Sequence, residues 1–151
     1  MTWKEYFMGK LNLPENAADW LVMGYEAMQV FDDYADGDEV TRDRLNKTIW
    51  DVMISMPLNP FFAANSSSLY PLISATILKW QASDTVERNG EADEVSFVWR
   101  AGFYDIVLIV YAIVHGPLKA TADAHKVMKM YGEKYPDYIK EVKPCLTQSR
   151  Q

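Results

Sequence analysis

The feature that most constrains the fold is an uncharged segment at residues 106–114, which reads IVLIVYAIV. A helix that is apolar on all sides belongs in a protein core or in a membrane. A bilayer span needs about 20 apolar residues, and Arg100 and Asp105 interrupt this segment before it reaches that length. We therefore expect a core element and no membrane association.

The same segment is rich in Val and Ile, which favour β-strands, so a buried strand is the alternative. Residues 91–115 contain no Gly-Pro pair, and a stretch of this length favours a helix. We predict one central helix over residues 91–115, buried on nearly all sides.

Capping residues and helix breakers indicate where the other helices begin and end. Thr2 with Glu5 fits a capping box, with Gly9 closing that first helix, and Thr41 and Ser68 are candidate N-caps. Asn89-Gly90 and Gly116-Pro117 are expected to end helices. The predicted helices cover residues 3–8, 17–35, 41–56, 68–88, 91–115 and 118–133, with a last turn or two after Pro136.

Hydrophobic periodicity predicts which side chains of these helices face the core. In the helix at residues 41–56 we expect five side chains to point inward: Leu45, Ile49, Val52, Met53 and Met56. Phe61 and Phe62 fall in the connection that follows, and we expect them to cover the end of the bundle rather than to bind a ligand.

A length of 151 residues predicts one domain, large enough to bury roughly 70% of its unfolded surface. The fold class predicted for residues 1–151 is an all-α bundle of about five main helices around the central helix. A short helical arm at residues 2–8 precedes this bundle, and a basic segment at residues 119–151 ends it.

The net charge of −6 is unevenly distributed. Residues 1–118 hold 8 basic and 17 acidic side chains, whereas residues 119–151 hold 7 basic and 4 acidic ones. Binding to nucleic acid needs clustered Lys and Arg, so an acidic chain argues against it. The basic segment could lie against an acidic face, although a solvated helix with Lys outward is the simpler interpretation.

The chain has a single cysteine, Cys145, which excludes an internal disulfide. The first ten residues, MTWKEYFMGK, contain no apolar run of signal-peptide length. We therefore expect a cytoplasmic protein in which Cys145 is an exposed, unreactive thiol.

An acidic run at residues 31–40, FDDYADGDEV, offers ligands for a divalent cation. Asp32, Asp33 and Asp36 form a DDxxD pattern that resembles the magnesium-diphosphate motif of trans-isoprenyl diphosphate synthases. The resemblance covers five residues, and it implies that carboxylates on one helix face hold Mg²⁺, which in turn holds phosphate oxygens. A solvated helix C-terminus is the alternative.

The same run also fits part of a calcium loop that starts at Asp32. Asp36 and Gly37 match the fifth and sixth positions of such a loop, but Tyr34 and Asp43 stand where other oxygen ligands are needed. We predict no cofactor for the chain, and Mg²⁺ or Ca²⁺ are the ions that the run could hold.

A second candidate site lies on the predicted central helix. Glu94 and Asp105 are eleven residues apart, or about three helical turns, and small residues near Asp105 leave room for a ligand or metal. Glu91, Glu94 and Asp105 give a distant likeness to the all-helical nucleotide pyrophosphohydrolases, which would imply metal-dependent hydrolysis of a nucleotide, but the second acidic pair is missing. The alternative is that Asp105 accepts hydrogen bonds from a packed neighbour.

A stripe on the same helix extends this candidate pocket. Arg100, Tyr104, Tyr111 and His115 follow one another at helical spacing, and they could line a pocket for an anion. They could equally be a seam where polar tips reach the surface past apolar bodies.

Aromatic and methionine side chains are abundant, with 5 Trp, 9 Tyr, 6 Phe and 8 Met. These residue types are enriched in the cores of protein interfaces. We therefore predict a non-enzymatic binding or assembly protein that forms a homodimer, or binds another protein, through aromatic and Met-rich surfaces. The alternatives are a Mg²⁺-dependent enzyme acting on a phosphorylated or nucleotide substrate, and a weak Ca²⁺-binding module.

Overall fold

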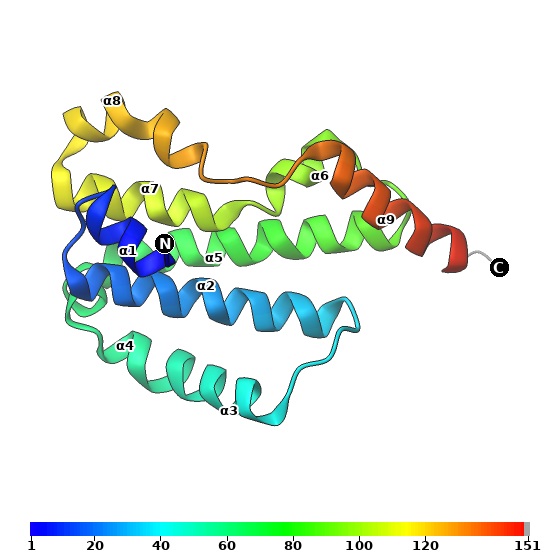
Figure 1. Cartoon of the computed structure of the whole chain (residues 1–151), viewed down its shortest axis with the longest axis horizontal. Helices are drawn as coiled ribbons and strands as arrows, with labels where there is room; N and C mark the ends of the chain where they lie inside the picture. The colour runs from blue at the N-terminus through cyan, green and yellow to red at the C-terminus, as the bar shows by residue number, and fades with distance from the viewer. Residues whose placement is uncertain (150–151) are drawn as a thin grey trace. The chain divides into compact units, whose positions relative to one another are not determined.

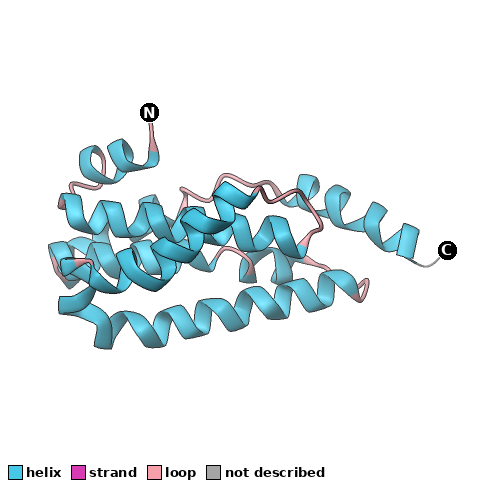
Figure 2. Ribbon diagram, turned by 90° about the horizontal axis from the view of Figure 1, so that it is seen from below, coloured by secondary structure: helices cyan, strands magenta, loops and turns pink. Residues whose placement is uncertain are grey.

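The structure is a computed structural model that describes the backbone of residues 1–149 and the side chains of residues 1–142. Figure 2 shows helices joined by turns and loops, with no strand within residues 1–149. The predicted all-α class is therefore confirmed. Contacts between backbone positions group the chain into two compact units, residues Met1–Ser68 and Leu69–Gln151, which we call unit 1 and unit 2.

Unit 1 contains two long antiparallel helical segments with a short helix at its start. The second long segment is continuous, because a π-helical stretch joins two α-helices, and we call it the 42–58 helix. It runs back alongside α2 (Figure 1). The elements of unit 1 are α1 (Trp3–Gly9), α2 (Glu15–Ala35), α3 (Arg42–Trp50), η1 (Asp51–Ser55), α4 (Met56–Leu58) and the start of α5 (Pro60–Arg88).

The predicted N-terminal arm forms α1, and its capping box is confirmed. The Thr2 hydroxyl accepts from the Glu5 amide at 3.1 Å, and the Glu5 carboxylate accepts from the Thr2 amide at 2.8 Å. The predicted role of Gly9 is wrong, because Gly9 is the last helical residue and the amide of Lys10 donates to the carbonyl of Tyr6. The arm docks on unit 1 through Phe7, whose side chain is fully buried.

The predicted start of a helix at Ser68 is also wrong, because α5 begins eight residues earlier, at Pro60. Asn59 supplies the cap: its side-chain oxygen accepts from the Phe62 amide at 3.2 Å, and its amide group donates to the carbonyl of Asn16 at 2.9 Å. Phe62 lies in the first turn rather than in a loop, and its ring stacks on Trp20 with the centroids 5.3 Å apart. Both Phe61 and Phe62 are buried.

The helix predicted from Thr41 is confirmed, since the Thr41 hydroxyl accepts from the Arg44 amide at 3.2 Å. The prediction of inward side chains is wrong for Leu45, Ile49 and Met53, whose exposed fractions are 45%, 52% and 68%. Val52 and Met56 are partly buried. The face that meets α2 carries Thr48, which is 6% exposed, and Met56. The Met56 Cε lies 3.4 Å from where a Cβ on Gly24 of α2 would stand.

Unit 2 contains most of α5 together with four further helices: α6 (Glu94–Trp99), α7 (Gly102–His115), α8 (Pro117–Met128) and α9 (Tyr135–Ser149). Helices α7 and α8 form a hairpin (Figure 1). The turn between them is confirmed at Gly116, whose φ of 89° suits a residue without a Cβ. The buried apolar side chains of the unit are Leu69, Phe103, Ile106, Val107, Val110, Tyr111, Ala120, Val127, Tyr138 and Val142.

The single central helix predicted over residues 91–115 is wrong, because the segment forms two helices that are interrupted at Arg100 and Ala101. Asp93 caps α6 by accepting from the amides of Val95 and Ser96, so residues 91–93 lie outside the helix. Ala101 leaves the helical region with ψ at 22°. At Gly102 the chain then passes so close to α5 that a Cβ would stand 2.8 Å from Thr76 Cγ2.

Burial of α7 is one-sided rather than complete, which corrects the expectation of a helix enclosed on nearly all sides. Val107 and Val110 are fully buried, whereas Ile109 and Ile113 are 37% and 36% exposed. Within the described residues, no helix combines the length and apolarity needed to cross a bilayer.

The C-terminal helices differ in length from the prediction. Helix α8 ends at Met128 rather than near residue 133, and α9 runs for 15 residues instead of one or two turns. Of the predicted basic segment, the side chains of residues 143–151 lie outside the described residues, as does the side chain of Cys145.

Candidate functional site

The acidic run lies at the C-terminal end of α2. Asp32 and Asp33 belong to the last turn, and Asp36 is the C-cap, with its amide donating to the carbonyl of Asp32 at 2.9 Å. The Asp33 carboxylate forms an ion pair with Arg44 of α3 at 2.9 Å. That pair therefore compensates one of the negative charges that oppose the helix dipole.

Among the described residues, no three His, Cys, Asp or Glu side chains gather closely enough to hold a metal ion. Asp32, Asp33 and Asp36 as metal ligands, with either Mg²⁺ or Ca²⁺, stay a prediction.

The six residues of the predicted pocket are divided among separate clusters. Glu94 opens α6 and is exposed. Because the chain breaks at Ala101, Glu94 and Asp105 do not share one helix face. Asp105 forms an ion pair with Lys79 of α5 at 2.9 Å, so it has the packed partner that the simpler interpretation expects.

Tyr111 and His115 form a second cluster, between α7 and α8. The Tyr111 hydroxyl donates to the Asp123 carboxylate at 2.5 Å, and the Tyr111 and His115 rings lie 4.5 Å apart. Burial, together with this hydrogen bond, raises the pKa of Tyr111 to about 12. The same bond lowers the pKa of Asp123.

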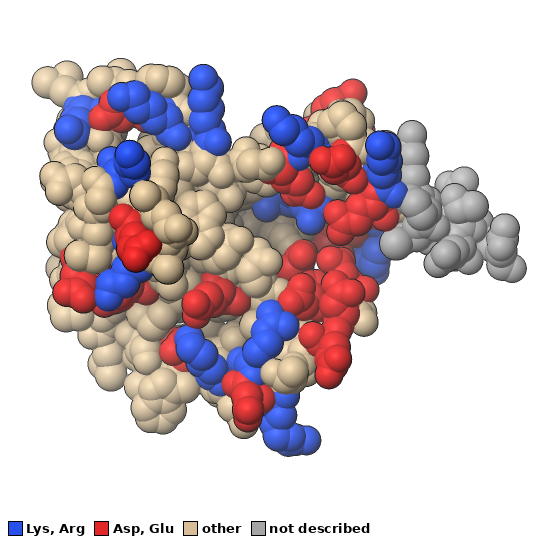
Figure 3. Space-filling view, in the orientation of Figure 1, with Lys and Arg blue, Asp and Glu red and all other residues tan. Residues whose placement is uncertain are grey.

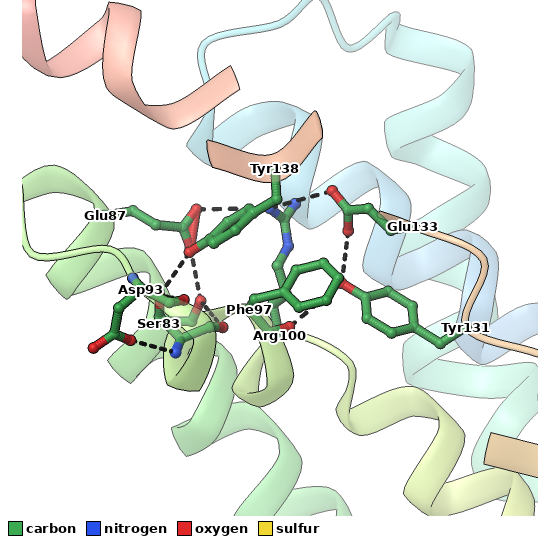
Figure 4. Close-up of polar contacts among 9 residues, drawn as sticks. Ser83, Glu87, Asp93, Phe97, Arg100, Tyr131, Glu133 and Tyr138 are labelled. Atoms are coloured by element: carbon green, nitrogen blue, oxygen red, sulfur yellow. Dashed lines mark hydrogen bonds and ion pairs between the residues drawn. The ribbon is translucent and has the colours of Figure 1, made fainter. Parts of the chain in front are cut away.

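A cluster of polar side chains surrounds Arg100 at the break between α6 and α7 (Figure 4). The guanidinium lies over the ring of Tyr138 from α9, 4.9 Å from its centroid. It also lies 3.9 Å from the carboxylate of Glu87 and 3.6 Å from that of Glu133. A cation over an aromatic face and between two acids is held both by the ring quadrupole and by charge.

The hydroxyl groups of Ser83, Ser96 and Tyr138 complete this cluster. Ser83 and Ser96 are fully buried, and the Ser83 hydroxyl lies 2.7 Å from the Glu87 carboxylate and 3.0 Å from the Ser96 carbonyl. The hydroxyls of Ser96 and Tyr138 are hydrogen-bonded at 2.8 Å. Burial raises the pKa of Tyr138, so the protonated hydroxyl that this network uses is the favoured form.

Tyrosine side chains extend the cluster along the chain that leads into α9. The Tyr131 hydroxyl donates to Glu133 at 2.7 Å, and burial with this bond raises the pKa of Tyr131. The Tyr131 ring contacts both Phe97 and Tyr104, with centroids 5.2 Å and 5.4 Å away. Of the predicted pocket residues, Arg100 and Tyr104 are thus the two that this cluster brings together.

The residues of this cluster that sequence reasoning missed are Ser83, Glu87, Ser96, Glu133 and Tyr138. Two signals could have found them. Asp93 and Ser96 have capping-box spacing. In addition, Tyr131, Tyr135, Tyr138 and Val142 recur at steps of four, three and four, as one docking face of a helical segment would.

Exposed apolar side chains gather on the outer side of the 42–58 helix, and we call this surface the 42–58 face. The six side chains of this face are 38% to 74% exposed: Leu45, Ile49, Trp50, Met53, Ile54 and Leu58. Residues 52–58 contain no charge, and the space-filling view shows the surface over α4 without acidic or basic side chains (Figure 3).

Ion pairs border the 42–58 face on the side toward α2. The Lys47 ammonium lies 2.5 Å from Asp51 and 3.0 Å from Glu26, and hydrogen bonding to these acids raises its pKa. Exposed pairs of this kind contribute about 0 to 1 kcal/mol each. They place the charges of Lys47 and Asp51 beside Glu26 of α2.

Comparison with known proteins adds no assignment: the chain matches no protein-family model, no curated protein and no solved structure.

Proposed function

We propose that this protein is a non-enzymatic assembly protein that forms a homodimer through the 42–58 face. The observation that carries the proposal is the exposure of Trp50 and Met53, at 63% and 68%. Tryptophan and methionine are both enriched in the cores of protein interfaces.

The size of the face is compatible with a dimer. The exposed parts of its six side chains amount to on the order of 600 Å² per copy, at the upper end for the largest apolar patch of a typical monomer. A standard interface buries about 800 Å² per partner. Side chains that border the face would supply the remainder.

A second copy is a suitable partner because one apolar helical face is complementary to itself around a two-fold axis. Charge favours the antiparallel arrangement of the two helices. Unit 1 has 5 basic and 11 acidic side chains, and five of those acids lie between Asp32 and Glu39, ahead of Thr41. Antiparallel helices of 17 residues place these two acidic ends about 25 Å apart, well beyond the Debye length of about 8 Å at physiological salt.

Light scattering coupled to size-exclusion chromatography tests the proposal. The unaltered chain should elute as a dimer at micromolar concentration, and Met53→Glu should elute as a monomer with unchanged helical content, because a charge would be buried at the centre of the interface. The matched control is Leu118→Glu on α8, where the side chain is 88% exposed. This control should remain dimeric.

Two results would overturn the proposal: a monomeric unaltered chain at high micromolar concentration, or a dimer that persists in Met53→Glu. Dissociation of Leu118→Glu together with Met53→Glu would equally remove the assignment to the 42–58 face.

A further inference from the structure

Among the described side chains of α9, Tyr138 is the one that is fully buried, and it anchors the helix to the rest of unit 2. The Tyr138 ring is fully buried, and its hydroxyl is hydrogen-bonded to Ser96. Among the described parts of the chain, α6 is the helix with which α9 shares most contacts. Tyr138 therefore determines where α9 packs, and Ser96 of α6 is the residue that binds its hydroxyl.

The surface that receives α9 is built from five side chains, which we call the α9 docking site: Ser83, Glu87, Ser96, Phe97 and Arg100. Ser96, Phe97 and Arg100 contact the segment at residues 131–142 directly, and Ser83 and Glu87 bind Ser96 and Arg100 from behind. Phe97 contacts the rings of Tyr131, Tyr135 and Tyr138 at centroid distances of 5.2 to 5.7 Å. Arg100 pairs with Glu133 and covers Tyr138 (Figure 4).

Recognition in this site is specific for tyrosine at the anchor position. The buried Ser96 hydroxyl lies 2.8 Å from the tyrosine hydroxyl, and the Arg100 guanidinium lies over the ring face. Phenylalanine would lose the hydrogen bond, and an aliphatic side chain would also lose the cation–π contact. The site thus has the character of a peptide-binding site whose occupant belongs to the same chain.

The connection that carries α9 to this site is not helical. Residues 129–134, between α8 and α9, contain no helix and run as an extended segment in Figure 1. Gly132 lies in it, and the nearest atom to a Cβ built there is a backbone oxygen 4.0 Å away. Tyr131 and Glu133 of this connection take part in the docked contacts, so the hinge of an exchanged element would be the turn at residues 129–130, just ahead of them.

We propose that the α9 docking site binds the 131–142 segment of a second copy when its own segment is not in place, so that copies are linked by exchange of α9. All contacts are the same in both arrangements, because the incoming segment is identical to the one it replaces. Within one chain, the high effective concentration of its own α9 favours the form in which that α9 occupies the docking site of the same chain. Exchange therefore becomes measurable when the binding of the chain's own 131–142 segment is weakened. It does not depend on the 42–58 face.

A mixing experiment with two full-length variants tests this exchange. The first carries Tyr138→Ala, which leaves its docking site intact but weakens its own anchor. The second carries Phe97→Ala and Arg100→Ala, which weaken its docking site but leave α9 intact. Both also carry Met53→Glu, so that association through the 42–58 face does not contribute to the signal.

With one variant labelled by fluorescein at its N-terminus, anisotropy measures association across a concentration series. The mixture should associate at least tenfold more tightly than either variant alone. The matched control adds Tyr138→Ala to the second variant, which removes the only intact anchor and should abolish the association.

The proposal is overturned if the two folded variants do not associate, or if association persists in the control. Circular dichroism establishes that each variant is folded. If Tyr138→Ala has lost helical content, Tyr138→Leu replaces it, since leucine keeps apolar volume but lacks the hydroxyl and the ring. The same two outcomes then decide the question.

Discussion

Helix α7 and the 42–58 helix carry similar apolar side chains and place them in opposite environments. Val107 and Val110 of α7 are fully buried, whereas Trp50 and Met53 of the 42–58 helix are more than 60% exposed. Apolarity alone therefore does not decide which face of a helix is covered. The difference comes from what each helix meets on its neighbours.

On α7, the close contact between the start of the helix and α5 determines which apolar face is covered. Gly102 allows the helix to begin in contact with Thr76 of α5, and the hairpin with α8 covers a further side. On the 42–58 helix the close approach uses Thr48 and Met56 against α2, where Gly24 makes room. The larger apolar side chains of that helix then face outward.

The largest expected effect is a difference in the free energy of unfolding between two variants, each of which truncates an aromatic residue of one of these helices. Phe103→Ala should lower the free energy of unfolding by about 3 to 5 kcal/mol, because the Phe103 side chain is 5% exposed and its loss leaves a cavity. Trp50→Ala should change it by about 0.5 kcal/mol or less in the monomer, since surface substitutions have small effects. Urea unfolding of both variants, each in the Met53→Glu background, measures the difference.

Equal losses in the two variants would contradict the comparison. Such a result would mean that Trp50 is covered within its own chain. The 42–58 face would then not be available to a partner.

A smaller effect is expected where α7 approaches α5. Gly102→Ala should cost about 1 to 3 kcal/mol, the usual range for overpacking, because its Cβ would stand 2.8 Å from Thr76 Cγ2. Thr76→Ser removes that methyl group, so the double variant should lose less than the sum of the two single losses. Thermal unfolding gives all three values.

Gly9→Ala is the matched control, because nothing lies within 4 Å of a Cβ at that position and the residue is helical. Alanine has the higher helix propensity, so this variant should be neutral or slightly more stable. A loss in Gly9→Ala as large as that in Gly102→Ala would remove the steric explanation.

The sequence was sufficient to predict the all-α class and those helix ends that depend on local contacts. Thr2, Thr41 and Gly116 act where their residue types predict, because a cap or a tight turn involves only a few neighbouring residues. The start of α5 was missed although Asn59 is a good capping type, since its second hydrogen bond goes to Asn16. That partner is 43 residues away and invisible to a local pattern.

The break in the predicted central helix shows a second limit. Residues 91–115 look continuous because Arg100 and Ala101 are ordinary helix formers. Their departure from helical geometry is compensated by contacts from distant parts of the chain, which include Glu87, Glu133 and Tyr138 around Arg100. The candidate docking site was missed for the same reason.

The smallest expected effect concerns the hydrogen bond between Tyr111 of α7 and Asp123 of α8. Tyr111→Phe should cost roughly 1 kcal/mol at pH 7, the net value of one hydrogen bond. Because the folded pKa of Tyr111 is raised to about 12, above the unfolded value near 10, this stabilisation is complete below pH 10. It is lost as the pH rises through 12.

The decisive quantity is the difference between the unaltered chain and Tyr111→Phe, since other tyrosines titrate in both. This difference in the free energy of unfolding should be constant from pH 7 to 9 and should shrink above pH 10. It should also shrink under acid conditions, because the pKa of Asp123 is lowered and its contribution is lost as the carboxylate becomes protonated. If the Tyr111→Phe difference stayed constant up to pH 12, the covered face of α7 would not depend on this bond to α8, and its burial would rest on apolar packing alone.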